Sequence, residues 1–427
     1  MGDFNIKPAE VGEKTQYLVH EYNDNMVRFL LHYPGMVDAQ ILRKAIRTIV
    51  DRVEVLHSSF FTDAIKAYWQ VNENYADADF FLYEKMDGNI TAATEGYFTR
   101  HIDSTSKVQL RCHLVQNEKE SVFVLIISHL CMDGGDGRYL LEKVAEAYNM
   151  ISEKGTAAGL TIKNGSRSPR QAYEKLSIKD YLSLFRSPIS KVKSVFPYPT
   201  KETGEARLCK AETSAKTMNA ARIKAKEAGA TVNDVLLAAC YHAYATLPGI
   251  DAKQPMSIMS MFDLRKHCKG GDSQGLCNMS GSLSTTLSNG VGETFLNTLC
   301  EIVKQTKAIK ENPLAGLEGV PLLYGISGSL PMGVLLRIAG YVYGSFSIGV
   351  TNMGNLNGEF VRFDKLTPDN AIFGGPLKKK PAMQVSIISL DAKCTLSATG
   401  DFTAEDAMLI QQMLDRMVGE IRNWSCE

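Results

Sequence analysis

The spacing of apolar residues along the chain predicts a series of helices and strands. Between residues 38 and 54, apolar side chains recur every three or four positions, which is typical of an amphipathic helix. The run Ser121–Ser128 is apolar on both faces, so we expect it to form a strand in the middle of a sheet. Val108–Gln116 predicts another strand, and residues 137–151 predict a helix that follows a glycine-rich turn.

The second half of the chain repeats this mixture of elements. Helices are expected at residues 216–228, 232–246 and 403–421, with Thr231 and Thr403 placed to cap the last two. Strands are expected at Met256–Leu264, Ser280–Leu287 and Phe346–Thr351, and in a hairpin of Met383–Leu390 and Lys393–Thr399. Each half is therefore predicted to be an α+β lobe, in which helices flank a sheet.

Length and a change in composition set the expected domain boundaries. A chain of 427 residues is too long for one ordinary hydrophobic core, so two lobes are expected. Residues 152–206 are rich in glycine, lysine and X-Pro steps, which is typical of a crossover between lobes. We place the N-terminal lobe at residues 1–175, a crossover linker at residues 176–207 and the C-terminal lobe at residues 208–427.

Charge and hydropathy exclude several classes of function. Lysine plus arginine number 47, as do aspartate plus glutamate, so the formal net charge is zero and no nucleic-acid partner is expected. The longest unbroken apolar run, Val122–Ile127, is far shorter than a membrane span. The longer apolar segment Leu322–Phe346 is interrupted by Pro331 and Arg337, which favours a buried or groove-lining helix.

The cysteines and the N-terminal segment favour a cytoplasmic protein. Nine cysteines are scattered without a CxxC pair, so neither a zinc site of paired thiolates nor a disulfide framework is expected. The segment Met1–Glu13 is polar and lacks the apolar core of a secretory signal. Cys131 and Cys240 are expected to be small core residues, and the reducing cytoplasm fits this pattern.

One histidine stands where a catalytic base would be useful. His129 directly follows the apolar strand, and a strand end holds a side chain rigidly beside a loop that opens to solvent or to a cleft. Asp133 follows in the turn, and Gly134 and Gly135 allow backbone conformations that other residues avoid. An imidazole with an ordinary pKa of about 6.5 can accept a proton near neutral pH, and so can activate a hydroxyl or an amine.

Other interpretations of this segment stay open on these grounds. His129 could be a structural residue at a strand end. Histidine and aspartate also bind metals, but no second cluster supports a metal site. Ser128 and His129 do not form a nucleophile–base pair, because neighbours on a strand point to opposite faces. The GxSxG, HExxH, P-loop and GxGxxG signatures are missing from the sequence.

The segment Ser128–Gly134 resembles the HHxxxDG motif of the chloramphenicol acetyltransferase-like superfamily. That superfamily includes nonribosomal peptide synthetase condensation domains, alcohol acetyltransferases and polyketide-associated acyltransferases. Further resemblances follow in order along nearly the whole chain. They are Asp38–Phe60 (first long helix and next strand), Ala221–Ala245 (a helix pair), Met261–Arg265 (a strand ending in arginine), Cys277–Met279 (a glycine-asparagine step) and Val350–Gly354 (a Ser-Asn-x-Gly segment).

The resemblance implies an α+β fold of two chloramphenicol acetyltransferase-like lobes, each a mostly antiparallel or mixed sheet with flanking helices. It also implies a tunnel between the lobes, with His129 as the catalytic residue at its middle and no resident metal or cofactor. Asp133, followed by Gly134, is implied to fix the loop by pairing with an arginine, for which Arg265 is the candidate. The residues implied to line the tunnel or to position substrates are Ser128, Asn278, Thr351 and Asn352.

The leading hypothesis for function is an acyltransferase that moves an acyl group to a small-molecule alcohol, with an amine acceptor less favoured. Acyl-CoA or the acyl-phosphopantetheine of an acyl carrier protein would be the co-substrate, and the fused lobes favour a monomer. Two alternatives stay open: a free-standing condensation enzyme that forms amides, and a non-catalytic binding protein. Ser128 stands in place of the first motif histidine, which supports the non-catalytic alternative. A family arginine is replaced near Leu56-His57-Ser58, which weakens the amide-forming alternative.

Overall fold

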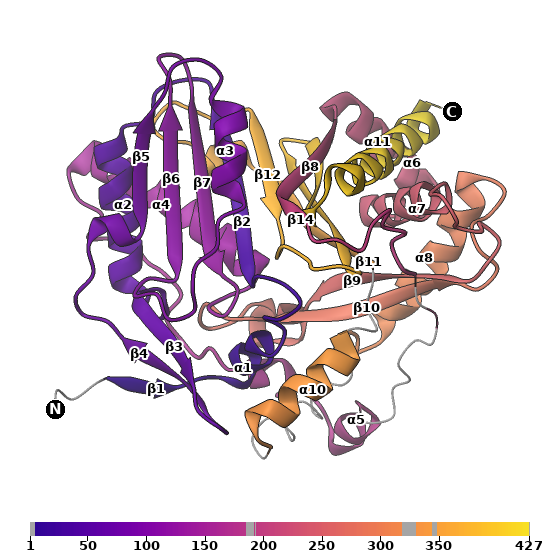
Figure 1. Cartoon of the computed structure of the whole chain (residues 1–427), viewed down its shortest axis with the longest axis horizontal. Coiled ribbons are helices and arrows are strands. Elements are labelled where there is room, and N and C mark those ends of the chain that lie inside the picture. Colours follow the sequence, from indigo (N-terminus) through magenta and orange to yellow (C-terminus); the bar gives the residue numbers. More distant parts are fainter. Residues whose placement is uncertain (1–4, 185–191, 193, 318–329, 344–347, 427) are drawn as a thin grey trace.

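Two lobes that lie side by side, each built on one large sheet, make up the fold (Figure 1). The computed structural model describes residues 5–184, 192, 194–317, 330–343 and 348–426. Within these residues both large sheets contain parallel as well as antiparallel strand pairs, and helices flank them. The prediction of a two-lobed α+β fold with mixed sheets is therefore confirmed.

The sheet of the N-terminal lobe has β7 (Ser121–Ser128) at its centre. β2 (Met26–Tyr33) and β6 (Leu110–Gln116) pair with β7 on either side, both antiparallel. β5 (Phe81–Lys85) runs parallel to β6 at one edge, and β12 (Asn370–Gly374) pairs with β2 at the other. Every residue of β7 is buried, as its continuous apolar pattern predicts.

Three helices cover the two faces of this sheet. α2 (Ala39–Arg52) packs against α4 (Gly134–Lys154), and both bury apolar side chains in the larger core of the lobe. α3 (Ile90–Phe98) contacts β7 from the opposite face. The two predicted helices are confirmed, although α4 begins earlier than expected because Asp133 caps it.

The sheet of the C-terminal lobe has the strand order β10-β9-β11-β13-β14-β8. β11 runs parallel to both of its neighbours, and the other pairs are antiparallel. The strands are β8 (Glu205–Thr213), β9 (Met256–Asp263), β10 (Ser280–Leu287), β11 (Ile348–Leu356), β13 (Met383–Leu390) and β14 (Lys393–Phe402). The predicted hairpin is β13–β14, and the strand predicted at Phe346–Thr351 extends to Leu356, while residues 346 and 347 lie outside the described residues.

In the part of this lobe that the structure describes, the core is enclosed by α6 (Ala215–Glu227), α7 (Val232–Ala245), α8 (Phe295–Glu311) and α11 (Ala404–Cys426). The predicted caps are confirmed. Thr231 Oγ1 accepts the N–H of Asp234 at 3.4 Å, and Thr403 Oγ1 accepts the N–H of Asp406 at 3.3 Å. Each aspartate in turn accepts the N–H of its threonine, so both helices start with a reciprocal capping box.

β12 shows that the lobes are not separated at a single point in the chain. Its residues follow most of the C-terminal lobe in sequence, yet it completes the N-terminal sheet beside β2. It also packs against β13 and β14, and the Ser397 hydroxyl donates to the carbonyl of Phe373 at 2.5 Å. The assignment of residues 208–427 to one lobe is therefore wrong for β12. Without this strand, β2 would leave an edge of unpaired backbone groups.

Smaller elements lie below the two lobes in Figure 1. β1 (Ile6–Pro8), β4 (Ala67–Val71) and β3 (Ser58–Thr62) form a third sheet. The other elements are α1 (Val11–Tyr17), α5 (Ile178–Ser183) and α10 (Met332–Tyr343). The helix expected at Leu322–Phe346 corresponds to α10, which buries Met332 and Leu335 against Leu18. The rest of that expected helix includes residues 322–329 and 344–346, which lie outside the described residues.

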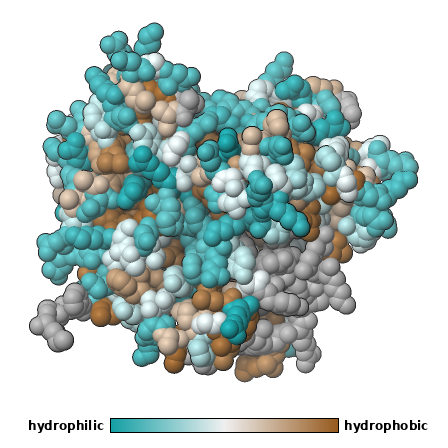
Figure 2. All heavy atoms as spheres, in the orientation of Figure 1, coloured by the Kyte–Doolittle hydropathy of each residue, from teal (hydrophilic) through white to brown (hydrophobic). Residues whose placement is uncertain are grey.

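Hydrophilic and hydrophobic residues are mixed over the face of the molecule that Figure 2 shows. In the described part of the chain, every helix is too short or too polar to cross a bilayer.

Candidate active site

The motif segment lies where β7 ends and α4 begins. Ser128 is the last residue of β7, and the N–H of His129 still donates to the carbonyl of Asn25 at 2.7 Å. The carboxylate of Asp133 accepts the N–H of Asp136 at 3.1 Å and so starts α4. A strand end and a helix start therefore fix both sides of the turn that carries His129.

His129 and Asn278 form a reciprocal pair of hydrogen bonds across the two lobes. His129 Nδ1 lies 2.8 Å from Asn278 Oδ1. Asn278 Nδ2 donates to the carbonyl of His129 at 2.8 Å and to that of Leu130 at 3.4 Å. Asn278 precedes β10 in the C-terminal half, so the imidazole is held from a segment far away in the sequence.

This pair determines which ring nitrogen carries the proton. A carbonyl oxygen only accepts, so the amide of Asn278 must turn its NH₂ group toward the backbone and its oxygen toward the ring. Nδ1 must then donate to that oxygen, which makes Nδ1 the protonated nitrogen of the neutral ring. The described residues form no hydrogen bond with Nε2.

The surroundings of the ring favour its neutral form. His129 is partly buried, and burial lowers its pKa below the ordinary value of 6.5. The charge of Asp133 and the hydrogen bond to Asn278 raise the pKa, but by less. The imidazole is therefore neutral at pH 7, which is the form that a general base requires.

Asp133 and Arg265 form a buried bidentate ion pair, as the resemblance implied. Arg265 donates from both terminal nitrogens to the two carboxylate oxygens, each at 3.0 Å. Asp133 also accepts the N–H of Met279 at 2.7 Å. Burial raises the pKa of Asp133, but the Arg265 guanidinium and these hydrogen bonds outweigh it, so the pKa is lowered. The carboxylate is therefore charged and joins α4 to the C-terminal half.

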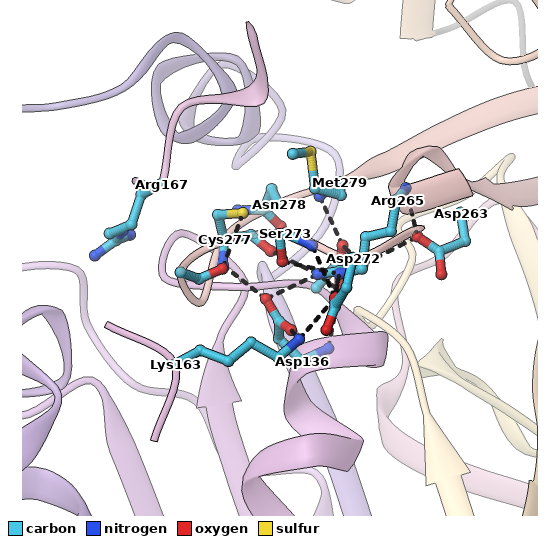
Figure 3. A network of polar contacts seen from close by, with 12 residues as sticks. Asp136, Lys163, Arg167, Asp263, Arg265, Asp272, Ser273, Cys277, Asn278 and Met279 are labelled. Atoms are coloured by element: carbon cyan, nitrogen blue, oxygen red, sulfur yellow. Dashed lines mark hydrogen bonds and ion pairs between the residues drawn. The ribbon is translucent and has the colours of Figure 1, made fainter. Parts of the chain in front are cut away.

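Further carboxylates surround the same guanidinium (Figure 3). Arg265 lies 2.8 Å from Asp136, 3.2 Å from Asp263 and 3.7 Å from Asp272. Asp136 is buried, whereas the side chains of Asp263 and Asp272 are about half exposed, at 51% and 53%. The polar network therefore extends from a buried centre to the surface.

Gly134 lies in close packing with the C-terminal sheet. A Cβ atom there would lie 2.8 Å from both the Sδ and the Cε of Met353 and 3.3 Å from the Phe373 ring. Met353 belongs to β11, and its carbonyl accepts from Arg138 of α4 at 3.2 Å. The start of α4 therefore packs directly against β11.

Among the described residues, the side chains of the other predicted site residues form no hydrogen bond with His129, Asp133 or Arg265. The Ser128 hydroxyl is buried and has no hydrogen-bond partner among those residues. Thr351 is buried in β11. Asn352 donates to Asn233 at 3.4 Å and accepts the N–H of Gly354 at 2.9 Å. Their roles in substrate binding stay predictions, and the residue of this strand that reaches the motif is Met353.

Sequence reasoning missed a second layer of charged residues behind the motif. Lys163 pairs with Asp136 at 3.3 Å, and Arg167 pairs with the buried Glu13. Both cations lie before residue 176, in the part of the crossover that was assigned to the N-terminal lobe. The sequence signal for this layer was the spacing of Asp133 and Asp136. Residues three apart lie on one side of a helix, so the two carboxylates lie next to each other.

The tunnel expected between the lobes stays a prediction. Two surface hollows, of about 510 and 570 Å³, are lined by residues other than His129. The described residues also contain no group of three or more histidine, cysteine or acidic side chains that could hold a metal ion.

Comparison with known proteins identifies the family. Residues 16–281 match the family model of the condensation domain, which covers more than half of the chain. The chain belongs to the condensation-domain family. Within it, the chain is 27% identical over 192 residues to the hybrid PKS-NRPS synthetase thnA of Trichoderma harzianum. The match spans only 5% of the length of that curated relative.

Solved structures share the fold of this condensation-domain protein over nearly its whole length. Polyketide synthase associated protein 5 from Mycobacterium tuberculosis is 14% identical, with a TM-score of 0.68 over 98% of this chain and 100% of that one. The condensation domain of the monacolin K polyketide synthase MokA is 15% identical, with a TM-score of 0.69 over 99% and 98%. TRI3 trichothecene 15-O-acetyltransferase from Fusarium sporotrichioides is 12% identical, with a TM-score of 0.69 over 97% and 95%. At these identities the likeness shows the fold alone.

Replacing Asp133 by alanine in this condensation-domain protein is expected to lower the free energy of unfolding by about 3 kcal/mol, because Arg265 loses its bidentate partner in a buried site. Urea unfolding at pH 7 measures the loss. Since the folded pKa of Asp133 is lowered, its contribution is present above the unfolded value of about 3.9 and disappears as the pH falls through the folded value. The difference between the two proteins should therefore shrink below about pH 4.

Asp272→Asn is the matched control, because Asp272 pairs with the same arginine but is half exposed. Its loss should cost less than about 1 kcal/mol. Equal stability of the Asp133→Ala variant and the unmodified protein at pH 7 would refute the structural role of the buried pair.

Proposed function

We propose that this condensation-domain protein transfers an acyl group from a thioester to an acceptor hydroxyl, with His129 Nε2 as the general base. An amine acceptor is the less favoured variant of the same reaction. The observation that carries the proposal is the reciprocal pair of hydrogen bonds between His129 and Asn278. It leaves the basic nitrogen unoccupied and holds the ring in one orientation.

The proposed reaction needs no covalent enzyme intermediate. Nε2 takes the proton of the acceptor hydroxyl while the hydroxyl oxygen attacks the thioester carbonyl carbon. The tetrahedral intermediate collapses with cleavage of the carbon–sulfur bond, and the departing thiolate takes the proton back from the imidazolium. The charge of Asp133, which raises the pKa of His129, favours the imidazolium that forms between these steps. Holding both substrates beside one base supplies the rest of the rate.

The co-substrate is proposed to be acyl-CoA or the acyl-phosphopantetheine of a carrier protein, and the protein is proposed to act as a cytoplasmic monomer. Neighbours with this fold are named as more than one kind of protein. One is named as a 15-O-acetyltransferase, and another is a condensation domain of the calcium-dependent antibiotic synthetase in complex with a substrate analogue.

Amide formation between carrier-bound substrates is the second candidate. The match to the condensation-domain model and the likeness to a hybrid PKS-NRPS synthetase favour it. A binding protein without activity is the third candidate, and Ser128 in place of a motif histidine is its support. The three candidate functions differ in which thioester donor is used and in whether activity requires His129.

Replacing His129 by alanine is expected to lower kcat for acyl transfer by about 100- to 10,000-fold, which is the usual contribution of a positioned base. Transfer is measured with an acyl-CoA and with the same acyl group on a phosphopantetheinylated carrier protein, each with alcohol and amine acceptors. His101→Ala is the control, because His101 is an exposed histidine outside the site. Transfer that is undiminished in the His129→Ala variant would exclude the proposed base. Transfer by the unmodified protein from the carrier alone, and to amines alone, would select the second candidate.

The pH dependence of the reaction is expected to reflect the lowered pKa of His129. The neutral ring is the active form, so kcat/KM should rise with pH through the pKa of the free enzyme and level off above it. Because burial lowers that pKa, the midpoint should lie below 6.5. Initial rates between pH 5 and 8 at constant ionic strength measure it. A midpoint above 6.5, or an unchanged limb in the residual activity of His129→Ala, would contradict the assignment.

A further inference from the structure

Two carboxylates at the start of α4 hold the backbone on both sides of Asn278. Asp136 accepts the N–H of Cys277 at 2.7 Å, and Asp133 accepts the N–H of Met279 at 2.7 Å. Figure 3 shows Cys277, Asn278 and Met279 beside Asp136 and Arg265. The residue that binds His129 is thus fixed by one hydrogen bond before it and one after it in the chain.

Asp136 is built into this position as firmly as Asp133. Its side chain is 1% exposed, lies 2.8 Å from Arg265 and lies 3.3 Å from Lys163. Burial and the neighbouring charge of Asp133 raise the pKa of Asp136, while the two cations oppose this effect. Lys163 also pairs with Asp272 at 2.8 Å, so the crossover segment is tied into the same network.

Holding only one side of Asn278 would leave its side chain less well defined. The peptide after Asn278 is held at the Met279 N–H, and the peptide directly before it is held at the Cys277 carbonyl, which accepts from Arg265 at 3.2 Å. The next peptide back, between Leu276 and Cys277, would be free to rotate if nothing held the N–H of Cys277. Rotation there would move the amide group that contacts the His129 ring and the His129 carbonyl. The bond from Cys277 to Asp136 removes that freedom, because it fixes the preceding segment as well.

We propose that Asp136 is a positioning residue for His129. Acting through the Cys277 N–H and Asn278, it keeps the imidazole in the tautomer that has Nδ1 protonated and Nε2 free. The role in catalysis rests on the proposed function of His129 as the base. The effect on the tautomer does not, and can be measured on the protein without substrate.

The test is ¹⁵N NMR of the full chain with labelled histidine, at a pH where His129 is neutral, combined with acyl-transfer kinetics. Loss of the His129 signals in His129→Ala assigns them. The unmodified protein should give a protonated Nδ1 and an unprotonated Nε2. In Asp136→Ala the two signals should move toward each other as the tautomers mix. The kcat should fall about 10- to 100-fold, as expected for a misplaced catalytic group, with KM values unchanged.

Two further variants separate positioning from general damage. Asp136→Asn keeps an oxygen that can accept the Cys277 N–H, so it should restore the tautomer and most of kcat. Asp272→Asn removes a carboxylate that pairs with the same Arg265 and Lys163 but accepts no N–H from Cys277, Asn278 or Met279. It should leave both the tautomer and kcat unchanged. If Asp136→Ala does not fold, Asp136→Ser takes its place, because its short hydroxyl cannot span the distance to Cys277.

A single His129 tautomer in the folded Asp136→Ala or Asp136→Ser variant would overturn the proposal. So would a tautomer that shifts equally in Asp272→Asn, because the effect would then come from the loss of charge around Arg265. Failure of the proposed function has a different signature. In that case the tautomer shifts in Asp136→Ala as expected, but acyl transfer does not depend on His129.

Discussion

The buried ion pair between Asp133 and Arg265 joins the two halves of the chain at the site, and the rest of the site depends on it. A charge removed from water is costly unless a partner and further hydrogen bonds compensate for it. Here each carboxylate oxygen faces one terminal nitrogen, and the other donors of Arg265 reach Ser273, Asp263 and the carbonyl of Cys277. Neither partner can be buried without the other, so the motif turn and the segment after β9 must dock together.

Docking of these two segments also brings Asn278 to His129. Arg265 and Asn278 belong to one stretch between β9 and β10, so the arginine that pairs with Asp133 also carries Asn278 to His129. The His129 ring, the proposed base, is then held by a rigid strand end on one side and by an anchored amide on the other. Such support around a reacting group is what keeps its geometry within the narrow limits that catalysis requires. In this chain the support includes Asp136, which lies beyond the family motif.

The sequence allows much of the fold to be predicted, because local patterns determine its elements. The continuous apolar run of β7 requires burial on both faces, and the Thr231 and Thr403 capping boxes mark where α7 and α11 begin. The insertion of β12 beside β2 has no local signature, since pairing of strands far apart in sequence is decided by the whole sheet. The short β1 and β4 were missed for the same reason, whereas β3 is the strand expected at the end of Asp38–Phe60.

The candidate site, like the fold, could be predicted from the sequence only in part. His129, Asp133 and Arg265 were predicted from a motif and an ordered resemblance, and the structure brings them together with Asn278. Lys163 and Arg167 were missed because a lysine or arginine in a glycine-rich crossover looks like any solvated residue. Their partners, Asp136 and Glu13, are buried carboxylates. These ion pairs can be recognised only once the crossover is folded against the motif.

A crystal structure of the protein with an unreactive thioester analogue and an acceptor alcohol would test the central claim most directly. We expect the acceptor oxygen within about 3 Å of His129 Nε2, with the thioester carbonyl carbon beside it and Nδ1 still bonded to Asn278 Oδ1. Substrates bound away from the ring, or a ring with Nε2 turned into the protein, would contradict the account.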